Sequence, residues 1–302
     1  MNIIISTGKA MKIKLVLQAF VIAVIVISLL HTPVLSENGS TGEFDNPVLL
    51  IRIDDLGMSH SVNMAAKEFF KTGLPVSASV MFACPWYQEA VEILQQYPDV
   101  AVGIHLTLNS EWKYYKWGPV AGKIAVPTLV DREGHFFPTR ADFFDNSPDL
   151  GEVEVELRAQ IERALASGLR IDYLDFHMGT ATSTPEIREV TERLANEFGL
   201  AMSGDYIQSY DSGIYAVPIE EKQDSLLSLI SHLPPGEKRL LVSHVAFDTP
   251  EMSVLVDLNQ HGLADMSKHR EAELKALTSA AFRETLRQYN VRLITYRDLL
   301  GN

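Results

Sequence analysis

Cysteine is almost absent, since Cys84 is the only one among 302 residues. A single thiol excludes an intramolecular disulfide framework and any zinc or iron–sulfur site built from several cysteines. Any bound metal must therefore be held by histidine and carboxylate ligands. Basic residues are also scarce, with 26 Lys and Arg against 39 Asp and Glu, which gives a formal net charge of −13. An acidic surface repels phosphate backbones, so nucleic acid is not expected as a partner.

The sequence also lacks the features of a disordered chain, because it contains no long charged block and no low-complexity tract. Hydrophobic residues make up 46% of the chain and the mean hydropathy is +0.03. This composition is typical of a globular protein with a packed core. The length suits one large α/β domain or two modest domains.

The longest apolar run lies near the N-terminus, from Leu15 to Leu30. Three lysines precede the run, and Val34-Leu35-Ser36 follows it with a small residue at which a signal peptidase can cut. Residues 1–36 are therefore predicted to be a secretory signal peptide, which would make the protein secreted or periplasmic. The alternative is an uncleaved membrane anchor, because the run is near the lower length limit of a membrane span. This segment is the only membrane contact that we expect.

After a polar linker at 37–46, residues 47–302 are predicted to form a single domain in which short apolar runs alternate with amphipathic stretches. The predicted strands are Val48–Ile53, Val76–Phe82, Val100–Leu108, Ile171–Phe176, Leu240–Val245 and Val291–Thr295. The predicted helices are Val62–Lys71, Tyr87–Gln96, Val153–Ala166, Glu186–Glu197 and Ala272–Gln288. Gly73, Gly168, Gly199 and Asn290 lie where helices end, as left-handed caps do. This alternation favours a largely parallel sheet in a barrel-like (β/α) domain.

Residues 109–148 interrupt this pattern with an aromatic segment rich in Pro and Gly. Asp131–Gly134 looks like a hairpin turn within it. Long irregular insertions are often lids or binding loops, so we expect this segment to lie over a binding site. Trp112 and Trp117 could stack on sugar rings there, or they could be buried.

Two predicted strands carry polar side chains close to their ends. Asp54 and Asp55 follow an apolar strand and precede Gly57, so they could be functional or could cap the following helix. His105 lies inside an apolar strand, where a structural, hydrogen-bonded histidine is the alternative to a ligand.

Two further strands end in the same way. Asp175 and His177 are two residues apart and share a face at the end of one strand, and His244 closes another. Because active sites of (β/α) barrels form at the carboxyl ends of the strands, these side chains are expected to meet. One carboxylate and two imidazoles form an open ligand set for a metal in a hydrolase.

These blocks and their order resemble the YdjC/ChbG family of carbohydrate deacetylases. The matching blocks are Ile53–Gly57, Ser77–Met81, Val102–Leu108, Asp175–His177, His244, Arg270–Leu277 and Arg292–Tyr296. They extend in order across residues 48–300. The resemblance implies an α/β fold, a distorted (β/α) barrel of the polysaccharide-deacetylase type, that removes N-acetyl groups from amino sugars or small oligosaccharides.

By position, the resemblance makes Asp55, His105 and His177 the ligands of one divalent metal, Mg²⁺ or Zn²⁺. It makes Asp54 the catalytic base and His244 the general acid. Gly179 and Val245 stand where many members have histidine and proline. The glycine at 179 suggests that the rim of the substrate-binding site differs from that of those members.

Two other classes remain open from the sequence. A glycosidase could use Asp54 or Asp55 as one of its acids, although it would not need His105 and His177. A secreted carbohydrate-binding protein could keep the same fold without turnover. Arg270 and Glu273 are three residues apart on a predicted helix, a spacing that favours a solvent-exposed or structural ion pair between them.

Overall fold

The computed structural model describes residues 46–207, 209–211, 214–260 and 262–301. The predicted signal peptide and all but the last residue of the predicted linker lie outside these residues. The described residues form one compact unit. Within the described residues, no helix is both long enough and apolar enough to cross a bilayer.

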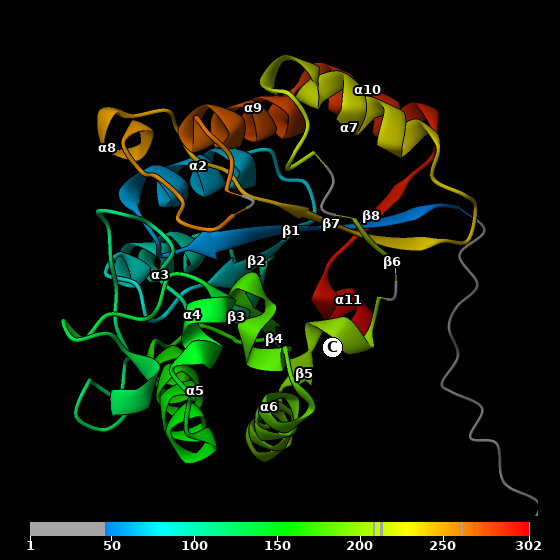
Figure 1. The fold of residues 1–302 in the computed structure, drawn as a ribbon. Coiled ribbons are helices and arrows are strands. Elements are labelled where there is room, and N and C mark those ends of the chain that lie inside the picture. Colours follow the sequence, from blue (N-terminus) through cyan, green and yellow to red (C-terminus); the bar gives the residue numbers. More distant parts are fainter. Residues whose placement is uncertain (1–45, 208, 212–213, 261, 302) are drawn as a thin grey trace, which may run out of the picture. The chain divides into compact units, whose positions relative to one another are not determined.

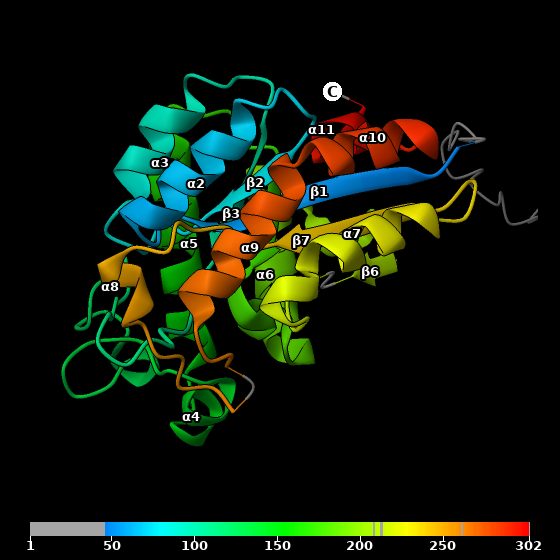
Figure 2. The ribbon, with the colours of Figure 1, turned by 90° about the horizontal axis from the view of Figure 1, so that it is seen from above.

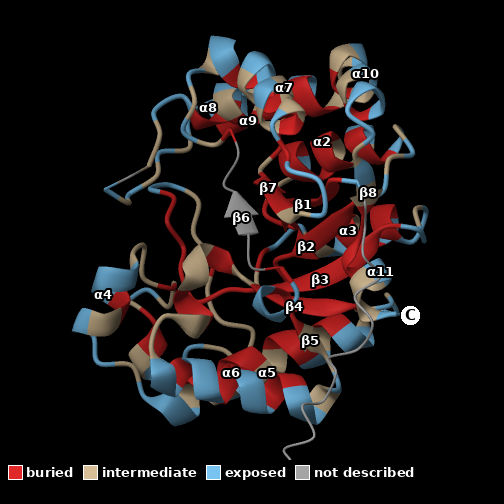
Figure 3. Ribbon diagram, turned by 90° about the vertical axis from the view of Figure 1, so that its right-hand side faces the viewer, coloured by how far each residue is buried: buried red, intermediate tan, exposed pale blue. Residues whose placement is uncertain are grey.

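In the part of the chain that the structure describes, eight parallel strands form one sheet in the order β5-β4-β3-β2-β1-β7-β6, with β8 beside the first part of β1. The strands are β1 (Val48–Leu56), β2 (Ser77–Val80), β3 (Ala101–Leu106), β4 (Tyr173–Phe176), β5 (Ala201–Met202), β6 (Ser209–Asp211), β7 (Lys238–Ser243) and β8 (Arg292–Ile294). The strand order puts β5 and β6 at the two edges of the sheet. The sheet curls into an open half-barrel (Figure 3). The α/β fold and the distorted-barrel class predicted from the sequence are confirmed.

Helices surround the sheet (Figure 1). They are α2 (His60–Phe70), α3 (Tyr87–Leu94), α4 (Arg140–Asp145), α5 (Leu150–Ala166), α6 (Pro185–Phe198), α7 (Lys222–Ser231), α8 (Pro250–Ser253), α9 (Met266–Thr278), α10 (Ala280–Gln288) and α11 (Tyr296–Leu300). Short 3₁₀ turns occur at Pro127–Leu129, His177–Thr182, Ser203–Asp205 and Ile219–Glu221. In the view of Figure 1, helices α2, α9, α7 and α10 lie above β1 and β7. Helices α5 and α6 lie below, near β4 and β5.

The centre of the sheet is its most buried part. Every residue of β1 is buried, because β7 pairs with one side of this strand while β8 and β2 pair in turn with the other. A strand covered on both faces is expected to be apolar along its length, as Val48–Ile51 is. Seen from above, α2, α9 and α7 lie over β1 and β7 (Figure 2).

The chain turns as its capping residues predict. Ser59 begins α2 by accepting a hydrogen bond from Val62 N, and Thr184 begins α6 in the same way. All four residues predicted as left-handed caps have positive φ, from 52° at Asn290 to 78° at Gly168. The predicted hairpin turn is also present, since Asp131 N donates to His135 O at 2.8 Å.

Two features of the sequence-based prediction need correction. Ala272–Gln288 is not one helix, because Ser279 has extended backbone, ends α9 and caps α10 by accepting from Phe282 N. Strands β5 and β6 and helices α4, α7, α8 and α11 were not predicted. The two strands are only two and three residues long, too short to show a periodic pattern.

Candidate active site

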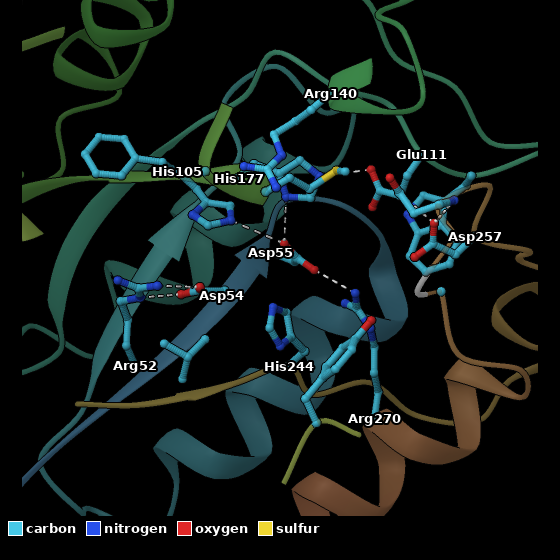
Figure 4. Close-up of a pocket in the computed structure, with 18 residues that line it drawn as sticks. Arg52, Asp54, Asp55, His105, Glu111, Arg140, His177, His244, Asp257 and Arg270 are labelled. Atoms are coloured by element: carbon cyan, nitrogen blue, oxygen red, sulfur yellow. Dashed lines mark hydrogen bonds and ion pairs between the residues drawn. The ribbon is translucent and has the colours of Figure 1, made fainter. Parts of the chain in front are cut away.

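The five residues predicted to act together line one cavity of about 410 Å³ at the carboxyl ends of the strands. Asp54 and Asp55 lie near the end of β1, His105 lies in β3, and His177 and His244 directly follow β4 and β7. Figure 4 shows His105 and His177 on one side of Asp55 and His244 on the other. The sheet therefore brings together side chains that are up to 190 residues apart in the sequence (244 − 54 = 190).

The end of β1 is irregular, and this separates the two adjacent carboxylates. The pairing of β1 with β2 shifts register between Ile53 and Leu56, as at a β-bulge. Asp55 has a φ of +68°, a left-handed conformation that is uncommon for a residue other than glycine. Asp54 consequently contacts Arg52 while Asp55 faces the two histidines. The alternative that these aspartates cap a helix is wrong, because Ser59 caps α2.

Asp55, His105 and His177 form a compact set of ligand atoms. Asp55 Oδ1 lies 3.5 Å from His105 Nε2 and 3.4 Å from His177 Nδ1. One ligand atom from each residue lies within 4.8 Å of the others, and all three residues are buried. Asp55 Oδ1 has no hydrogen-bond partner among the described residues although it is shielded from solvent. A buried carboxylate oxygen facing two imidazole nitrogens fits a divalent metal ion.

Each of the two histidines is held by a carboxylate at its other ring nitrogen. His105 Nδ1 lies 2.8 Å from Asp175 Oδ2, and His177 Nε2 lies 2.9 Å from Glu111 Oε2. Such outer carboxylates fix the orientation of metal-ligating histidines. The two rings therefore present different nitrogens, Nε2 of His105 and Nδ1 of His177, toward Asp55.

These carboxylates also control the charge of the rings. Burial alone would lower the pKa of His105, but Asp175 and Asp54 outweigh it and raise this pKa to about 9. Burial likewise opposes protonation of His177, whose pKa rises to about 10 because of Glu111 and Asp55. In the metal-free protein both rings are therefore protonated at neutral pH, and a metal must displace their protons.

Arg52 links the carboxylates of Asp54 and Asp175. Its Nε and Nη2 donate to the two oxygens of Asp54 at 2.7 and 2.8 Å, and its Nη1 lies 2.8 Å from Asp175 Oδ1. Burial would raise the pKa of Asp175, but Arg52 and His105 lower it. Asp54, His105 and Asp175 also satisfy the spacing of a metal site, yet Arg52 already supplies the cation between these aspartates.

Arg270 differs from its sequence-based prediction. It does not pair with Glu273 but lies buried in the cavity wall, with its Nη2 2.7 Å from Asp55 Oδ2. Its guanidinium also lies 5.6 Å from the centre of the Trp112 ring. Burial would raise the pKa of Asp55, but Arg270 and the two histidines hold it well below its usual range. Arg270 thus occupies one oxygen of Asp55 and leaves the other facing the histidines.

His244 lies across Asp55 from the two histidines (Figure 4). Its Nδ1 is buried without a hydrogen-bond partner among the described residues. The Tyr215 ring is 5.5 Å away in an edge-on arrangement. Burial lowers the pKa of His244, with Asp55 opposing and Arg270 adding to the effect. The resting imidazole is therefore mostly neutral at pH 7.

The insertion 109–148 reaches this cavity, as its position in the sequence suggested. Glu111, Trp112 and Arg140 line the cavity, and Arg140 extends from α4 toward the histidines (Figure 4). The two tryptophans are not exposed sugar platforms, because Trp112 is 1% and Trp117 is 3% exposed. Trp117 donates to Asn109 O at 2.8 Å and packs against His177.

Sequence reasoning missed the site contacts of Arg52, Glu111 and Arg270. Arg52 could have been found, since a residue two positions before Asp54 in a strand shares its face. Glu111 follows the β3 strand in an irregular segment whose path no pattern predicts.

Comparison with known proteins agrees with this arrangement. The model of the YdjC-like protein family matches residues 48–288. The chain belongs to this family. The resemblance seen in the sequence blocks is therefore confirmed, and the matched range contains every candidate site residue discussed above.

The matches to curated relatives extend over nearly the whole length of those proteins. A carbohydrate deacetylase from Thermoanaerobacter pseudethanolicus is 27% identical over 83% of this chain and 98% of its own. One from Brevibacillus brevis is 28% identical over 83% of this chain and 99% of its own. A crystal structure from Enterococcus faecalis, of a protein proposed to cleave cellobiose phosphate, aligns with a TM-score of 0.67 and 25% identity. It covers 84% of this chain and 99% of that one.

Proposed function

We propose that this protein is a metal-dependent carbohydrate deacetylase, a hydrolase that removes N-acetyl groups from amino sugars or small oligosaccharides. The observation that carries the proposal is the convergence of Asp55, His105 and His177 around a buried Asp55 Oδ1 that has no hydrogen-bond partner among the described residues, in the cavity at the strand ends. The deacetylase names of the curated relatives support the reaction type.

The chain's own residues fit one divalent ion. Asp55 would supply an oxygen ligand, and His105 and His177 would supply nitrogen ligands that Asp175 and Glu111 already orient. Imidazole suits Zn²⁺, whereas Mg²⁺ is bound mainly through oxygen, so Zn²⁺ is the first ion to test and Mg²⁺ the second. When bound, such an ion supplies a Lewis acid that polarises the acyl oxygen and makes water more acidic.

Asp54 is positioned to accept the proton of the attacking water. It lines the cavity beside the ligand set, and its two contacts with Arg52 fix the direction of its carboxylate. A carboxylate in this position acts as a general base. Arg52 also holds Asp175, so the base and the support of His105 are tied to the same guanidinium.

His244 is positioned to give a proton to the departing amine. It faces the cavity from the opposite wall, and its Nδ1 has no hydrogen-bond partner among the described residues. Because its pKa is lowered, the imidazole must gain a proton during the reaction before it can donate one. The protons balance if the one that Asp54 takes from the water passes to His244 and from His244 to the amine.

The rival functions are less consistent with these contacts. A retaining glycosidase needs two carboxyl groups free to act at about 5 Å separation. Here Asp55 contacts Arg270 and both histidines, so it is not free to act as the second carboxyl group beside Asp54. A purely sugar-binding protein would have no use for a set of buried metal-type ligands.

We further propose that the protein is exported through its N-terminal segment 1–36 and meets its acetylated sugar outside the cytoplasm. The lysines followed by an apolar run support this proposal. Detection of the processed chain in the exported fraction tests it, and retention of the full-length chain inside the cell would contradict it.

Acetate release from N-acetylated amino-sugar oligosaccharides tests the reaction. We expect the purified protein to release acetate when loaded with Zn²⁺ or Mg²⁺ and to stop when a chelator removes the ion. Cleavage of the glycosidic bond without acetate release would instead favour a glycosidase. Glycan binding without any product would favour a binding protein.

A further inference from the structure

A buried ion pair lies directly behind the cavity wall that carries His244. Lys222, the first residue of α7, and Glu273 in α9 are 0% and 1% exposed. Lys222 Nζ lies 3.2 Å from Glu273 Oε1. Neither residue lines the cavity, so the pair is not a part of the site already described.

Lys222 holds the chain segment that carries Tyr215. Besides Glu273, its Nζ donates to the backbone carbonyl oxygens of Ile214 and Tyr215, the latter at 2.9 Å. An ammonium group has three protons to donate, so these three acceptors satisfy it fully. The backbone at Ile214 and Tyr215 is thus held by α7 through Lys222, and by α9 through the contact of Lys222 with Glu273.

Glu273 holds the end of β7. Its Oε2 accepts hydrogen bonds from Ser243 Oγ at 2.7 Å and from the backbone N–H of His244 at 2.9 Å. The carboxylate therefore fixes the backbone from which the His244 side chain leaves. No other side chain of the described residues has a hydrogen bond to this N–H.

The two residues whose backbone this network holds, Tyr215 and His244, are neighbours in the cavity. Tyr215 and His244 both line it, and their rings are 5.5 Å apart. A buried ion pair is often no more stabilising than apolar residues of the same size, so stability alone does not explain this one. Its hydrogen bonds end on the backbone of the two residues that form one cavity wall.

We propose that Glu273 and Lys222 are positioning residues that set the places of His244 and Tyr215 for catalysis. This inference rests on the proposed function, in which His244 transfers a proton to the leaving amine. Neither residue touches Asp55, His105 or His177, so their effect is on turnover and not on metal binding.

Three variants separate positioning from general stability. Glu273→Gln keeps the size of the side chain and removes its charge. The double variant Lys222→Met/Glu273→Leu removes both charges and avoids leaving one of them buried alone. Lys275→Met is the matched control, because it removes a lysine charge from the exposed face of α9, where Lys275 contacts Glu271.

We expect kcat on an N-acetylated sugar to fall about 10- to 100-fold in both pair variants, as is found for residues that support a catalytic group. Metal content should be unchanged, and Lys275→Met should keep wild-type kcat. Loss of metal in proportion to the loss of kcat would overturn the proposal.

A second comparison places the effect at His244. In a His244→Ala background, Glu273→Gln should lower kcat far less than it does in the wild-type background, because Glu273 contacts the backbone of His244 directly and reaches Tyr215 only through Lys222. An equal loss in both backgrounds would show that Glu273 acts on the structure at large and would overturn the inference. The charge-free double variant serves for the same comparison if Glu273→Gln does not fold.

A measurement without turnover keeps this test independent of the proposed function. The ring nitrogen resonances of His244, assigned with His244→Ala in ¹⁵N-histidine-labelled protein, should move in Glu273→Gln and stay in place in Lys275→Met. Unmoved resonances would overturn the inference. If the wild-type protein released no acetate, the proposed function would fail while this measurement still judged the pair.

Discussion

Asp175 Oδ2 lies 2.8 Å from His105 Nδ1, and this contact turns the other ring nitrogen of the histidine toward Asp55. Asp175 is buried and is itself held by Arg52 at 2.8 Å, so the ring has little freedom to rotate. A histidine can therefore lie in this apolar strand, because its Nδ1 contacts Asp175 and its Nε2 faces Asp55. It also makes Asp175 important for metal affinity although it is not one of the proposed ligands.

The first prediction concerns this contact. Asp175→Asn should weaken metal binding about 10- to 100-fold, because removing an outer-sphere carboxylate typically costs this much. Isothermal titration with Zn²⁺ measures the change. Asp224→Asn, on the exposed face of α7, is the control and should bind metal like the wild type. Wild-type affinity in Asp175→Asn would show that the carboxylate does not support the ligand.

The second prediction concerns pH. In the metal-free protein the pKa of His105 is about 9 and that of His177 about 10, both raised from 6.5. Below pH 9 both rings are therefore protonated, and a metal that binds them must release the protons. Metal affinity should rise with pH, by up to about two decades per pH unit between pH 7 and 9, and level off above pH 10.

Titration in buffers of different ionisation enthalpy checks this by counting released protons. About two should leave on metal binding at pH 7 in the wild type. Fewer should leave in Asp175→Asn, because the largest cause that raises the pKa of His105 is then removed. Affinity that does not change between pH 7 and 9 would mean that the histidines are not ligands.

The third prediction separates the two proton-transfer residues. Asp54→Asn should abolish turnover of every substrate with the metal still bound, because the amide keeps the shape but cannot accept a proton. His244→Ala should slow an N-acetyl sugar by about 10²- to 10⁴-fold, the usual contribution of general acid catalysis. An activated phenyl ester leaves without protonation, so the same variant should hydrolyse it at close to the wild-type rate. Equal losses on amide and ester would assign His244 a structural role.

The fourth prediction follows from the burial of Trp117. A fully packed tryptophan replaced by alanine typically costs about 3–5 kcal/mol, so Trp117→Ala should lower the free energy of unfolding by that amount. Trp86→Ala, at a ring that is 43% exposed, should cost much less. Denaturant titrations of both variants provide the comparison. A stable Trp117→Ala with weaker substrate binding would restore the idea of a sugar platform.

The strand ends were the most predictable part of this protein. Apolar runs such as Val48–Ile53 and Val100–Leu108 show buried strands directly, and the left-handed residue at Gly199 shows where a helix stops. Once the strands are known to be parallel, their carboxyl ends must meet at one edge, so His105 and His177 could be placed together from the sequence.

The contacts around these residues could not be predicted in the same way. Whether Arg270 pairs with Glu273 or with Asp55 depends on how deeply α9 packs, and helical spacing alone favoured the wrong partner. The division of Ala272–Gln288 into two helices depends on one residue, Ser279, whose cap competes with a continuous helix. Glu111 reaches His177 only because of the folded path of an irregular segment.

The most direct test of the central claim is a metal titration of acetate release. The chelator-treated protein should release no acetate from an N-acetylated amino-sugar oligosaccharide, and stepwise addition of Zn²⁺ or Mg²⁺ should restore release up to a plateau at a single ion per chain. Asp55→Asn should show no such recovery. Full release by the protein without bound metal, or no acetate from any N-acetylated sugar at saturating ion, would contradict the account.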